Sequence, residues 1–514
     1  MKVSACLKMA FALCFAASVA AAQGKGIYYV TNYGAKGDGK TIDTKSINKA
    51  IDAAATAGGG TVWFPAGSYL SGSIHLKSNI SLYIDQGATI VAADYTPEAG
   101  YDKPENVVTN QYEDFGHRHW HNSLIWGENL HDVSILGPGL LWGKGLERTN
   151  RINKMTDETF MNPNKTIALY KCHNVILRDF SILHGGWFGI LATATDNLTI
   201  DNLKMDTNRD GMDVDCCWNV RISNCSVNSP EDDGICLKSS YGLNTGRATE
   251  NVTITNCQVS GYDEGSFLDG TFKRTIDYGA DGPTGRIKFG TESNGGFKNI
   301  TISNCVFSYC RGLALETSDG ALLEDVTINN ITMRDITNSP IFVRLNGRMR
   351  APATDTVGAL RRVIISNVVC YNADPRQGAL ISGIPGHDIN DLTLSNIRIY
   401  FKGGGTAEQA KIVVPELEKE YPEPGRFKET PSYGFFVRHV NDLKMKDIEV
   451  HYMNTDQRPA FMFDSITGAD LEHLRGQHPS GVPTLVLNKV NGLALHNSPN
   501  IADTKTDHID HKEL

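Results

Sequence analysis

Two Asp-Gly pairs recur in the chain at an interval of 23 residues. One begins at Asp210 and the other at Asp233; Asp232 directly precedes the second pair, and Asp213 follows Asp210 by three positions. If 23 residues make one turn of a repeating structure, Asp210 and Asp233 stack at the same corner of neighbouring turns. The interval therefore predicts a patch of three or four carboxylates.

Closely placed carboxylates repel one another, which raises some of their pKa values and lets a protonated acid and an ionised base coexist at neutral pH. Glycoside hydrolysis with inversion needs such a pair roughly 6.5–9.5 Å apart, with room for a water molecule. One step of the repeat plus an offset along a strand is compatible with that separation. A Ca²⁺ site would use the same residue types, and a solvated acidic corner would have the same spacing, so these interpretations stay open.

Short alternating apolar phrases, most of them led by Asn or Asp, form the repeat. Alternation with β-branched residues predicts strands, and Asn, Asp and Gly at both ends predict turns. Three successive phrases start 23 and 22 residues apart, which leaves no room for a crossover helix in every unit. The pattern predicts an all-β fold, a single-stranded right-handed parallel β-helix. The phrases start at Asp132, Asn174, Asn197, Asn219, Asn251, Asn299, Asp325, Arg362, Asp391 and Asp442.

A helix is predicted near the N-terminus over residues 43–55, because Ile47, Ala50, Ile51 and Ala54 share one face. Such a helix would cap the open end of a solenoid. The predicted organisation is a signal peptide over 1–22, the cap and first coils over 23–95, a β-helix catalytic domain over 96–495 and an exposed C-terminal tail over 496–514.

Three segments carry a resemblance to a known family. Residues 208–213 (NRDGMD) are similar to an NTDGID motif, and residues 229–234 (SPEDDG), followed by LKS at 237–239, are similar to a paired-aspartate motif. The opening phrase YGAKGDG at 33–39 also matches. Together they resemble glycoside hydrolase family 28, the polygalacturonases and their relatives, over roughly residues 27–460.

The resemblance implies a right-handed β-helix of inverting hydrolases that act on pectic polymers without a cofactor or a metal ion. Asp232 resembles the general acid of the family. Asp210 and Asp233 resemble the pair that activates water. Asn208 and Asp213, from the first motif, are expected among the substrate-binding residues.

The sequence departs from the family in its basic residues. The family has Gly-His-Gly one coil after the paired aspartates and a later Arg-Ile-Lys that contacts the galacturonate carboxylate. Here Arg286 and Lys288 lie in the frame of Gly-His-Gly, whereas Ala314 and Glu316 occupy the frame of the basic pair. We expect a uronate carboxylate to be held by Arg286, Lys288 or Lys238, because Arg suits a bidentate contact and Lys a point contact.

Further basic residues are less specific. Lys238 aligns one coil after Asp215 and would pair with it if it were not needed for substrate. Weaker candidates for the uronate lie in a later coil, at Arg344, Asn346 and Arg348. His117, His119 and His121 are expected on a loop near the site, in contact with sugar or solvent rather than with a metal ion.

Two insertions are expected beside the site, at 262–283 and 402–432. Long loops in a compact solenoid are usually functional or disordered. Placed at the site, these loops would close one end of it and favour attack at a chain end.

The composition limits the partners. The 514 residues contain 49 Lys+Arg and 58 Asp+Glu, a net charge of −9, which argues against nucleic acid and anionic membranes. The basic start, short apolar run and Ala-rich end of residues 1–22 are typical of a signal peptide, and its removal leaves −11. We therefore expect export to the periplasm or the extracellular space, without membrane insertion. Cys225, Cys257 and Cys305 follow Asn in near-identical phrases and are expected inside the coil, not in disulfides.

The leading prediction is an inverting glycoside hydrolase that cleaves α-linked galacturonic acid bonds in pectic polysaccharide or its oligosaccharides. We expect it to be exo-acting and of rhamnogalacturonan or oligogalacturonide type. One alternative is a polysaccharide lyase on the same fold, which would need Ca²⁺ and a basic proton abstractor. Another is a non-catalytic carbohydrate-binding β-helix. The sequence makes no prediction of oligomeric state.

Overall fold

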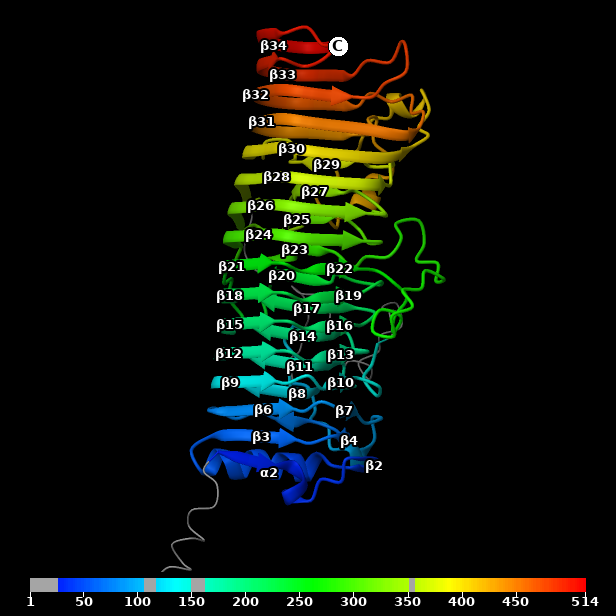
Figure 1. The fold of residues 1–514 in the computed structure, drawn as a ribbon. Coiled ribbons are helices and arrows are strands. Elements are labelled where there is room, and N and C mark those ends of the chain that lie inside the picture. The colour runs from blue at the N-terminus through cyan, green and yellow to red at the C-terminus, as the bar shows by residue number, and fades with distance from the viewer. Residues whose placement is uncertain (1–25, 106–116, 149–161, 351–355) are drawn as a thin grey trace, which may run out of the picture.

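The computed structural model describes residues 26–105, 117–148, 162–350 and 356–514, and the predicted signal peptide lies outside them. The strands wind into one tall coil and join a single hydrogen-bonded sheet of 34 strands (Figure 1). Nearly every strand pairs in parallel with the strand one turn later; the single antiparallel pair among the named strands is the last one. The prediction of an all-β parallel solenoid is confirmed.

Each early turn contributes three strands, which stack in three columns that form the faces of the coil. The first column, which carries the site described below, contains β5 (Ile74–His75), β8 (Ser123–Glu128), β11 (Lys165–Tyr170), β14 (Phe188–Thr193), β17 (Asp210–Asp215), β20 (Ile235–Ser239), β23 (Ile287–Ser293), β25 (Leu313–Thr317), β27 (Ile341–Leu345) and β29 (Ala379–Ser382). The second contains β1 (Ile27–Tyr29), β3 (Gly60–Phe64), β6 (Ile80–Ile84), β9 (His131–Leu136), β12 (His173–Arg178), β15 (Asp196–Asp201), β18 (Trp218–Ser223) and β21 (Thr249–Thr255). The third contains β2 (Asp38–Ile42), β4 (Gly67–Ser71), β7 (Ala88–Ala92), β10 (Leu140–Trp142), β13 (Ser181–Leu183), β16 (Lys204–Asp206), β19 (Ser226–Asn228) and β22 (Gln258–Ser260).

In the later turns the second and third columns merge into long strands, and from β31 onward the first column joins them. These are β24 (Phe297–Ser308), β26 (Leu322–Arg334), β28 (Ala359–Ala373), β30 (Ile389–Gly403), β31 (Phe435–Asn454), β32 (Phe461–Gly476), β33 (Leu485–His496) and β34 (Thr504–Glu513). One α-helix and several 3₁₀ turns complete the described elements: α2 (Thr44–Thr56), η1 (Val30–Tyr33), η2 (Pro97–Ala99), η4 (Gln409–Lys411) and η5 (Pro424–Phe427). None of the helices in the described ranges is both long and apolar enough to cross a membrane.

The core is a continuous apolar column inside the coil. Val175, Leu198, Val220, Val252 and Ile300 occupy equivalent positions in successive turns and are all buried. Alternation along each strand points these side chains inward and their polar neighbours outward. The register therefore places apolar side chains of successive turns directly above one another, which explains why the apolar phrases repeat along the sequence.

The Asn residues that lead the phrases have a structural reason. Asn174, Asn197, Asn219, Asn251 and Asn299 all adopt φ values between 50° and 59°, a left-handed conformation that Asn tolerates better than most residues. Their side chains also bond from turn to turn: the amide of Asn197 donates to Asn174 at 3.1 Å and that of Asn299 to Asn251 at 2.7 Å. The same residue type thus forms the bend and links the turns.

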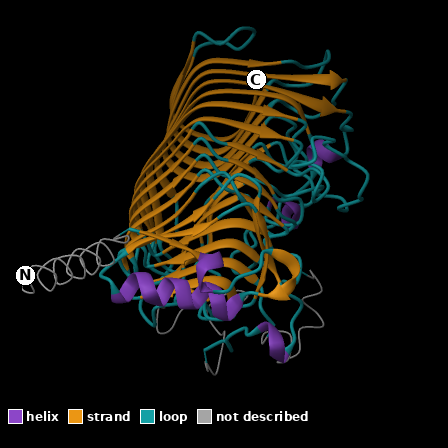
Figure 2. Ribbon diagram, turned by 60° about the horizontal axis from the view of Figure 1, so that its bottom comes forward, coloured by secondary structure: helices purple, strands orange, loops and turns teal. Residues whose placement is uncertain are grey.

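Helix α2 lies across the N-terminal end of the coil (Figure 2). Ile47, Ala50, Ile51 and Ala54 are buried on one face of it, so the predicted cap is confirmed. Asp43, at the N-cap position, does not bond to the helix; its carboxylate accepts from the backbone N–H groups of residues 36 and 37 instead.

Residues 496–514 were predicted to form an exposed tail, and this prediction is wrong for most of the segment. Within it, β34 pairs antiparallel with β33 over most of its length, and Ile509 is buried. The strand could not be predicted from its sequence, because β34 is mostly exposed and therefore lacks the alternating apolar pattern of the other strands.

The cysteines of the described residues, including Cys225, Cys257 and Cys305, are buried with free thiols. Cys225 and Cys305 place Sγ 3.2 Å from the carbonyl oxygens of Ser223 and Ser303, two positions before each. Their predicted placement inside the coil is confirmed.

Candidate active site

The paired aspartate segments lie on adjacent turns of the first column. Asp210 begins β17, and Asp232 and Asp233 end the turn before β20. The N–H of Gly211 donates to the carbonyl of Asp233 at 2.9 Å, so the two Asp-Gly pairs stack as the 23-residue interval predicted. A Cβ on Gly211 would lie 2.4 Å from the carbonyl oxygen of Gly234, and this close approach of two backbones accounts for glycine after Asp210.

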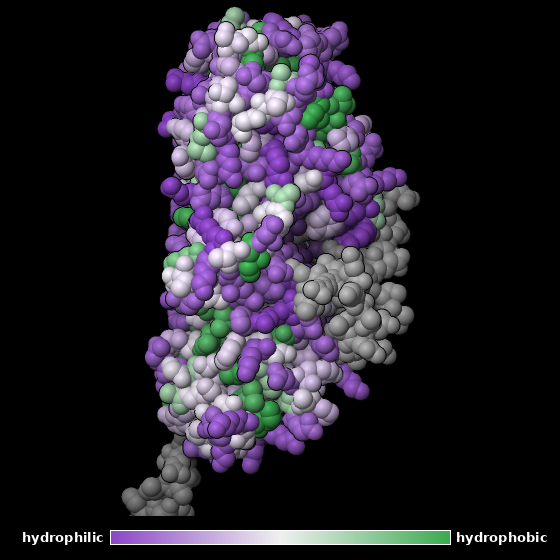
Figure 3. Space-filling model, turned by 90° about the vertical axis from the view of Figure 1, so that its right-hand side faces the viewer, coloured by the Kyte–Doolittle hydropathy of each residue, from purple (hydrophilic) through white to green (hydrophobic). Residues whose placement is uncertain are grey.

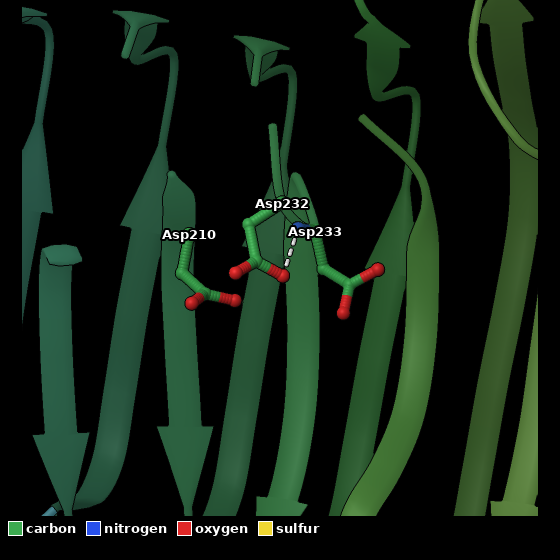
Figure 4. Close-up of side chains that lie close together, drawn as sticks. All are labelled: Asp210, Asp232 and Asp233. Atoms are coloured by element: carbon green, nitrogen blue, oxygen red, sulfur yellow. Dashed lines mark hydrogen bonds between the residues drawn. The ribbon is translucent and has the colours of Figure 1, made fainter. Parts of the chain in front are cut away.

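Three carboxylates converge at this corner, with that of Asp232 between those of Asp210 and Asp233 (Figure 4). Oxygen atoms of all three lie within 4.8 Å of one another. The separation predicted from the spacing is therefore wrong: the groups are closer than the roughly 6.5–9.5 Å usual for inverting enzymes. Asp210 and Asp233 are buried, whereas the Asp232 side chain is 29% exposed, so Asp232 is the carboxyl that a substrate reaches most easily.

The surroundings set the pKa values of Asp210 and Asp233 apart. Burial, aided by the Asp213 and Asp232 carboxylates, raises the pKa of Asp210 well above its usual range. Burial also acts to raise the pKa of Asp233, but Lys288 and Arg286 outweigh it and hold that pKa at about 2. The two pKa values are thus displaced in opposite directions, which favours a proton on Asp210 over one on Asp233, and acid–base catalysis uses such a difference.

Arg286 and Lys288 lie one turn after Asp233, in the frame predicted for them: Lys288 pairs in register with Cys236 before it and Ala314 after it. Their predicted role as ligands of a uronate carboxylate is not what the structure shows, because both are buried against protein carboxylates. Arg286 Nε is 2.8 Å from Asp233 Oδ1, and Lys288 Nζ is 3.2 Å from Asp233 Oδ2. They hold the ionised member of the site.

Glu423, which sequence reasoning missed, comes from the second insertion and faces the same arginine. Its two carboxylate oxygens lie 3.2 and 2.7 Å from Arg286 Nη1 and Nη2. Arg311 Nη1 lies 3.0 Å and Asn338 Nδ2 3.3 Å from Oε1. A residue about 190 positions after Asp233 thus completes the surroundings of the site, and no local motif points to it.

Lys238 and Asp213 also pair with protein groups rather than standing free for substrate. Lys238 Nζ lies 3.4 Å from Asp213 Oδ2 and 3.2 Å from Glu292 Oε2, all three buried. His117 Nε2 lies 3.0 Å from the same Asp213 oxygen and is buried. The predicted substrate contacts of Lys238 and Asp213 and the solvent or sugar contact of His117 are therefore corrected to one buried ionic cluster.

The predicted pairing of Lys238 with Asp215 is wrong, although the two residues are in register. Asp215 instead accepts from the backbone N–H and the hydroxyl of Ser240, at 2.7 and 2.6 Å. The other two histidines of the loop, His119 and His121, face Glu105 at 3.8 and 3.0 Å.

Asn208 and Arg209 lie directly before Asp210. Asn208, predicted to bind substrate, is buried and its amide donates to the carbonyl of Arg148 at 3.0 Å, so it positions a neighbouring segment. Arg209 Nη2 lies 2.8 Å from Asp232 Oδ2, and its guanidinium lies 5.9 Å from the centre of the Trp187 ring. Arg209 therefore fixes the carboxyl that is most open to substrate.

The second insertion runs between β30 and β31 and packs against the first column. Arg344 donates through Nη2 to the carbonyls of Glu416 and Leu417 at 2.7 and 2.9 Å. Arg438 donates to the carbonyl of Val414 at 2.9 Å. Arg344, a weaker candidate for uronate binding, therefore holds this loop in place.

The other two weak candidates are likewise used within the protein. The Asn346 amide donates to the carbonyl of Glu420 at 2.8 Å, and Arg348 pairs with Asp319 at 2.6 Å. Tyr421, from the same loop, places its ring 5.7 Å from Lys288 Nζ and 5.5 Å from the Arg348 guanidinium. The loop thus covers the turns that follow the aspartates.

The first insertion folds toward earlier turns. The backbone N–H groups of Gly265, Phe267 and Leu268 donate to the carboxylate of Asp206 at 2.9–3.0 Å. Glu264 Oε1 lies 3.8 Å from Arg148 Nη1, and burial raises the pKa of Glu264 to about 7. The two insertions therefore border the aspartates from different sides.

The buried cluster around Asp213 predicts a pH dependence of stability. Burial acts to lower the pKa of His117, but the hydrogen bond to Asp213 outweighs it and raises the pKa to about 9. Because the folded-state pKa lies above the unfolded value of about 6.5, this stabilisation is complete below pH 6.5 and is lost as the pH rises through 9. We expect the melting temperature to fall by about 2–5 °C over that range.

Thermal unfolding by circular dichroism at several pH values tests this. His117→Gln should show a smaller fall than the unchanged protein, whereas the control His508→Gln, on an exposed histidine, should show the same fall. Equal pH dependence in all three proteins would contradict the assignment of the effect to His117.

Known proteins with similar sequences include β-helix proteins and polygalacturonases. Residues 27–126 match the family model described as rhamnogalacturonase A/epimerase, pectate lyase-like, and residues 142–280 match that of the right-handed β-helix region. The chain is 22% identical over 396 residues to a probable polygalacturonase of Vitis vinifera, covering 72% of this chain and 74% of the relative. It is 24% identical over 440 residues to an exo-poly-α-D-galacturonosidase of Dickeya chrysanthemi, covering 72% and 71%.

A solved exopolygalacturonase from Thermotoga maritima superposes with a TM-score of 0.63 at 20% identity, over 83% of this chain and 92% of that one. At this identity the match shows the fold. The chain is a right-handed parallel β-helix protein whose two aspartate segments form a cluster of three carboxylates. It is similar to polygalacturonases over most of its length, and its two aspartate motifs resemble those of glycoside hydrolase family 28.

Proposed function

We propose that the protein hydrolyses α-linked galacturonic acid bonds in pectic polysaccharide or its oligosaccharides, by inversion and from a chain end. The observation that carries the proposal is the convergence of three carboxylates within 4.8 Å, two of them with pKa values displaced in opposite directions. The polygalacturonases among the relatives support the substrate class.

The carboxylates divide the work between them. Asp232 is the exposed member of the cluster and is placed to donate a proton to the glycosidic oxygen, and the neighbouring Asp210, whose pKa is raised well above its usual range, is the carboxyl that can supply that proton. Asp233 stays ionised beside Arg286 and Lys288 and accepts a proton from the attacking water. Asp232 and Asp233 thus keep the roles that the family resemblance implies, whereas Asp210, which the resemblance assigns to water activation, takes part on the acid side.

Inversion is supported although the carboxylates are closely spaced. A retaining enzyme uses one carboxylate as a nucleophile that attacks the sugar directly. Asp233 is buried with its two oxygens facing Arg286 and Lys288, and Asp210 is buried with a raised pKa, so both are poor nucleophiles. A water molecule activated by Asp233 is the better nucleophile.

The stereochemistry is a direct test. We expect proton NMR during the first minutes of hydrolysis to show the β-anomer of the new reducing sugar, which then mutarotates. Initial appearance of the α-anomer would show retention and would contradict the role of Asp233 as a base acting through water.

Attack at a chain end is supported by the second insertion. Glu423 contacts Arg286 and Arg311, just before β23 and β25, and Tyr421 lies against Lys288 of β23. Leu417 is held by Arg344 on β27, so the loop packs over the turns after the aspartates. The His117 loop lies over β17 on the other side. The loop-bearing face is mainly hydrophilic, as a polysaccharide partner requires (Figure 3).

One incubation separates the candidate functions. With homogalacturonan, rhamnogalacturonan and their oligosaccharides, we expect short products released from one end, resolved by chromatography, and no loss of activity in EDTA. A rapid fall in viscosity ahead of reducing-end release would contradict chain-end attack. Unsaturated, ultraviolet-absorbing products that depend on Ca²⁺ would indicate a lyase, and binding without any product would indicate a non-catalytic protein.

We also propose that the protein is exported, on the evidence of the predicted signal peptide. The buried free cysteines do not oppose this, because burial shields the thiols from oxidation.

A further inference from the structure

A protein carboxylate occupies a receptor for carboxylates next to the catalytic aspartates. Arg286, Arg311 and Asn338 direct four nitrogen atoms at Glu423, over distances of 2.7–3.3 Å. Paired guanidinium groups with an amide are the groups that recognise a carboxylate with bidentate geometry. The receptor is therefore built for a carboxylate, and the chain supplies that carboxylate itself.

The receptor is joined directly to the catalytic machinery. Arg286 uses Nε for Asp233, at 2.8 Å, and its two terminal nitrogens for Glu423. One side chain thus spans a candidate catalytic carboxylate and the filled receptor, so Glu423 lies one arginine side chain away from Asp233.

Glu423 is presented rigidly. Pro422 and Pro424 flank it and are buried, and Phe427, three residues later, packs against Phe342 of β27. Arg286 and Arg311 outweigh burial and hold the pKa of Glu423 at about 2, so it stays anionic over the working pH range. Its side chain is 13% exposed, so the negative charge is partly open to a ligand.

We propose that Glu423 is a specificity-determining residue: its carboxylate fills the receptor of Arg286, Arg311 and Asn338, so that the adjoining subsite takes a neutral sugar in place of a second uronate. A uronate there would meet a fixed negative charge, and the cations that would hold its carboxylate are already bonded. A neutral deoxyhexose or hexose meets neither obstacle and can accept or donate hydrogen bonds at the same surface. This inference rests on the proposed function and names the substrate class within it: chains in which galacturonate alternates with a neutral sugar.

The test compares two oligosaccharides of equal length, one made of galacturonate alone and one in which galacturonate alternates with rhamnose. We expect the unchanged protein to favour the alternating substrate in kcat/KM by about tenfold or more. Glu423→Gln keeps the shape and removes the charge, so a uronate in the adjoining subsite no longer meets a fixed anion and is attracted by the uncompensated charges of Arg286 and Arg311. It should move the ratio toward the all-uronate substrate by about tenfold or more, chiefly through KM.

Glu420→Gln is the matched control, since it makes the same charge change at an exposed position of the same loop, and its ratio should equal that of the unchanged protein. A ratio unaltered by Glu423→Gln while hydrolysis continues would overturn this inference and leave the proposed function standing. Absence of hydrolysis of either substrate by the unchanged protein would overturn the proposed function. Calorimetric binding of both oligosaccharides to Asp232→Asn, with and without Glu423→Gln, then reports the preference independently of turnover.

Thermal unfolding shows whether Glu423→Gln folds. If it does not, the unchanged protein is compared on the all-uronate oligosaccharide and its methyl ester, whose sugars carry no charge. Faster cleavage of the ester supports the role of Glu423, and equal or slower cleavage counts against it.

Discussion

Replacing Asp232 by Asn lowers kcat on a pectic oligosaccharide by about 10³-fold or more, while the melting temperature stays within a few degrees. The amide keeps the shape of the side chain and can still accept from Arg209 Nη2, now 2.8 Å from the carboxylate. It has no proton to give to a leaving oxygen, and general acid catalysis contributes about 10²–10⁴-fold in typical cases. Initial rates from reducing-end assays measure the loss.

The control for this experiment is Asp52→Asn, which makes the same change on the exposed surface of α2 and should leave kcat unaltered. A variant at Asp232 that keeps kcat within about tenfold of the unchanged protein would show that another group donates the proton. Asp210, whose pKa is raised by burial in the same corner, would then be the residue to replace next.

Asp213→Asn is expected to have the largest effect on stability, a loss of about 3 kcal/mol or more in the free energy of unfolding. Asp213 is buried and faces two cationic groups, Lys238 at 3.4 Å and His117 at 3.0 Å. Removal of one partner from a buried ion pair leaves an uncompensated charge in a medium that solvates it poorly, which costs about 3–5 kcal/mol. Urea denaturation followed by circular dichroism gives the value.

Glu472→Gln provides the comparison, because it removes a charge from a surface ion pair with Lys446, in which the lysine is exposed and the glutamate partly exposed. Such pairs contribute about 0.2–1 kcal/mol. Similar losses for the two variants would mean that water or a rearranged Glu292 compensates the cations around Asp213, and the buried cluster would then be less important than its geometry indicates.

The parts of the site that follow the repeat could be predicted from sequence. Asp210 and Asp233 stack because equal spacing along the chain becomes equal height along the coil, and the displacement of Arg286 and Lys288 by one turn follows from the same counting. The bends could also be predicted, because the Asn residues that lead the phrases tolerate the positive φ values that the bends require.

The partners of the charges could not be predicted in this way. Glu423 and His117 reach the site from loops whose paths do not follow the repeat, and they change what the basic residues do: Arg286 and Lys238 bind protein carboxylates instead of lying open to substrate. The spacing of the repeat predicts where each cation lies, but the carboxylate that neutralises it can come from far along the chain. His117 and Asp213 are 96 residues apart, and Arg286 and Glu423 are 137 residues apart.

The two ends of the coil differ in a way that bears on self-association. A solenoid exposes unpaired backbone groups at each end, and like ends can continue one another into a fibre. Here α2 covers the first turn. At the other end β34 runs antiparallel to β33, so a further parallel turn would find no strand of matching direction to pair with. Lys505, Asp507 and Asp510 give that final strand a charged outer side. Neither described end of the coil therefore offers an open parallel edge, and we expect concentrated solutions to remain free of end-to-end polymers.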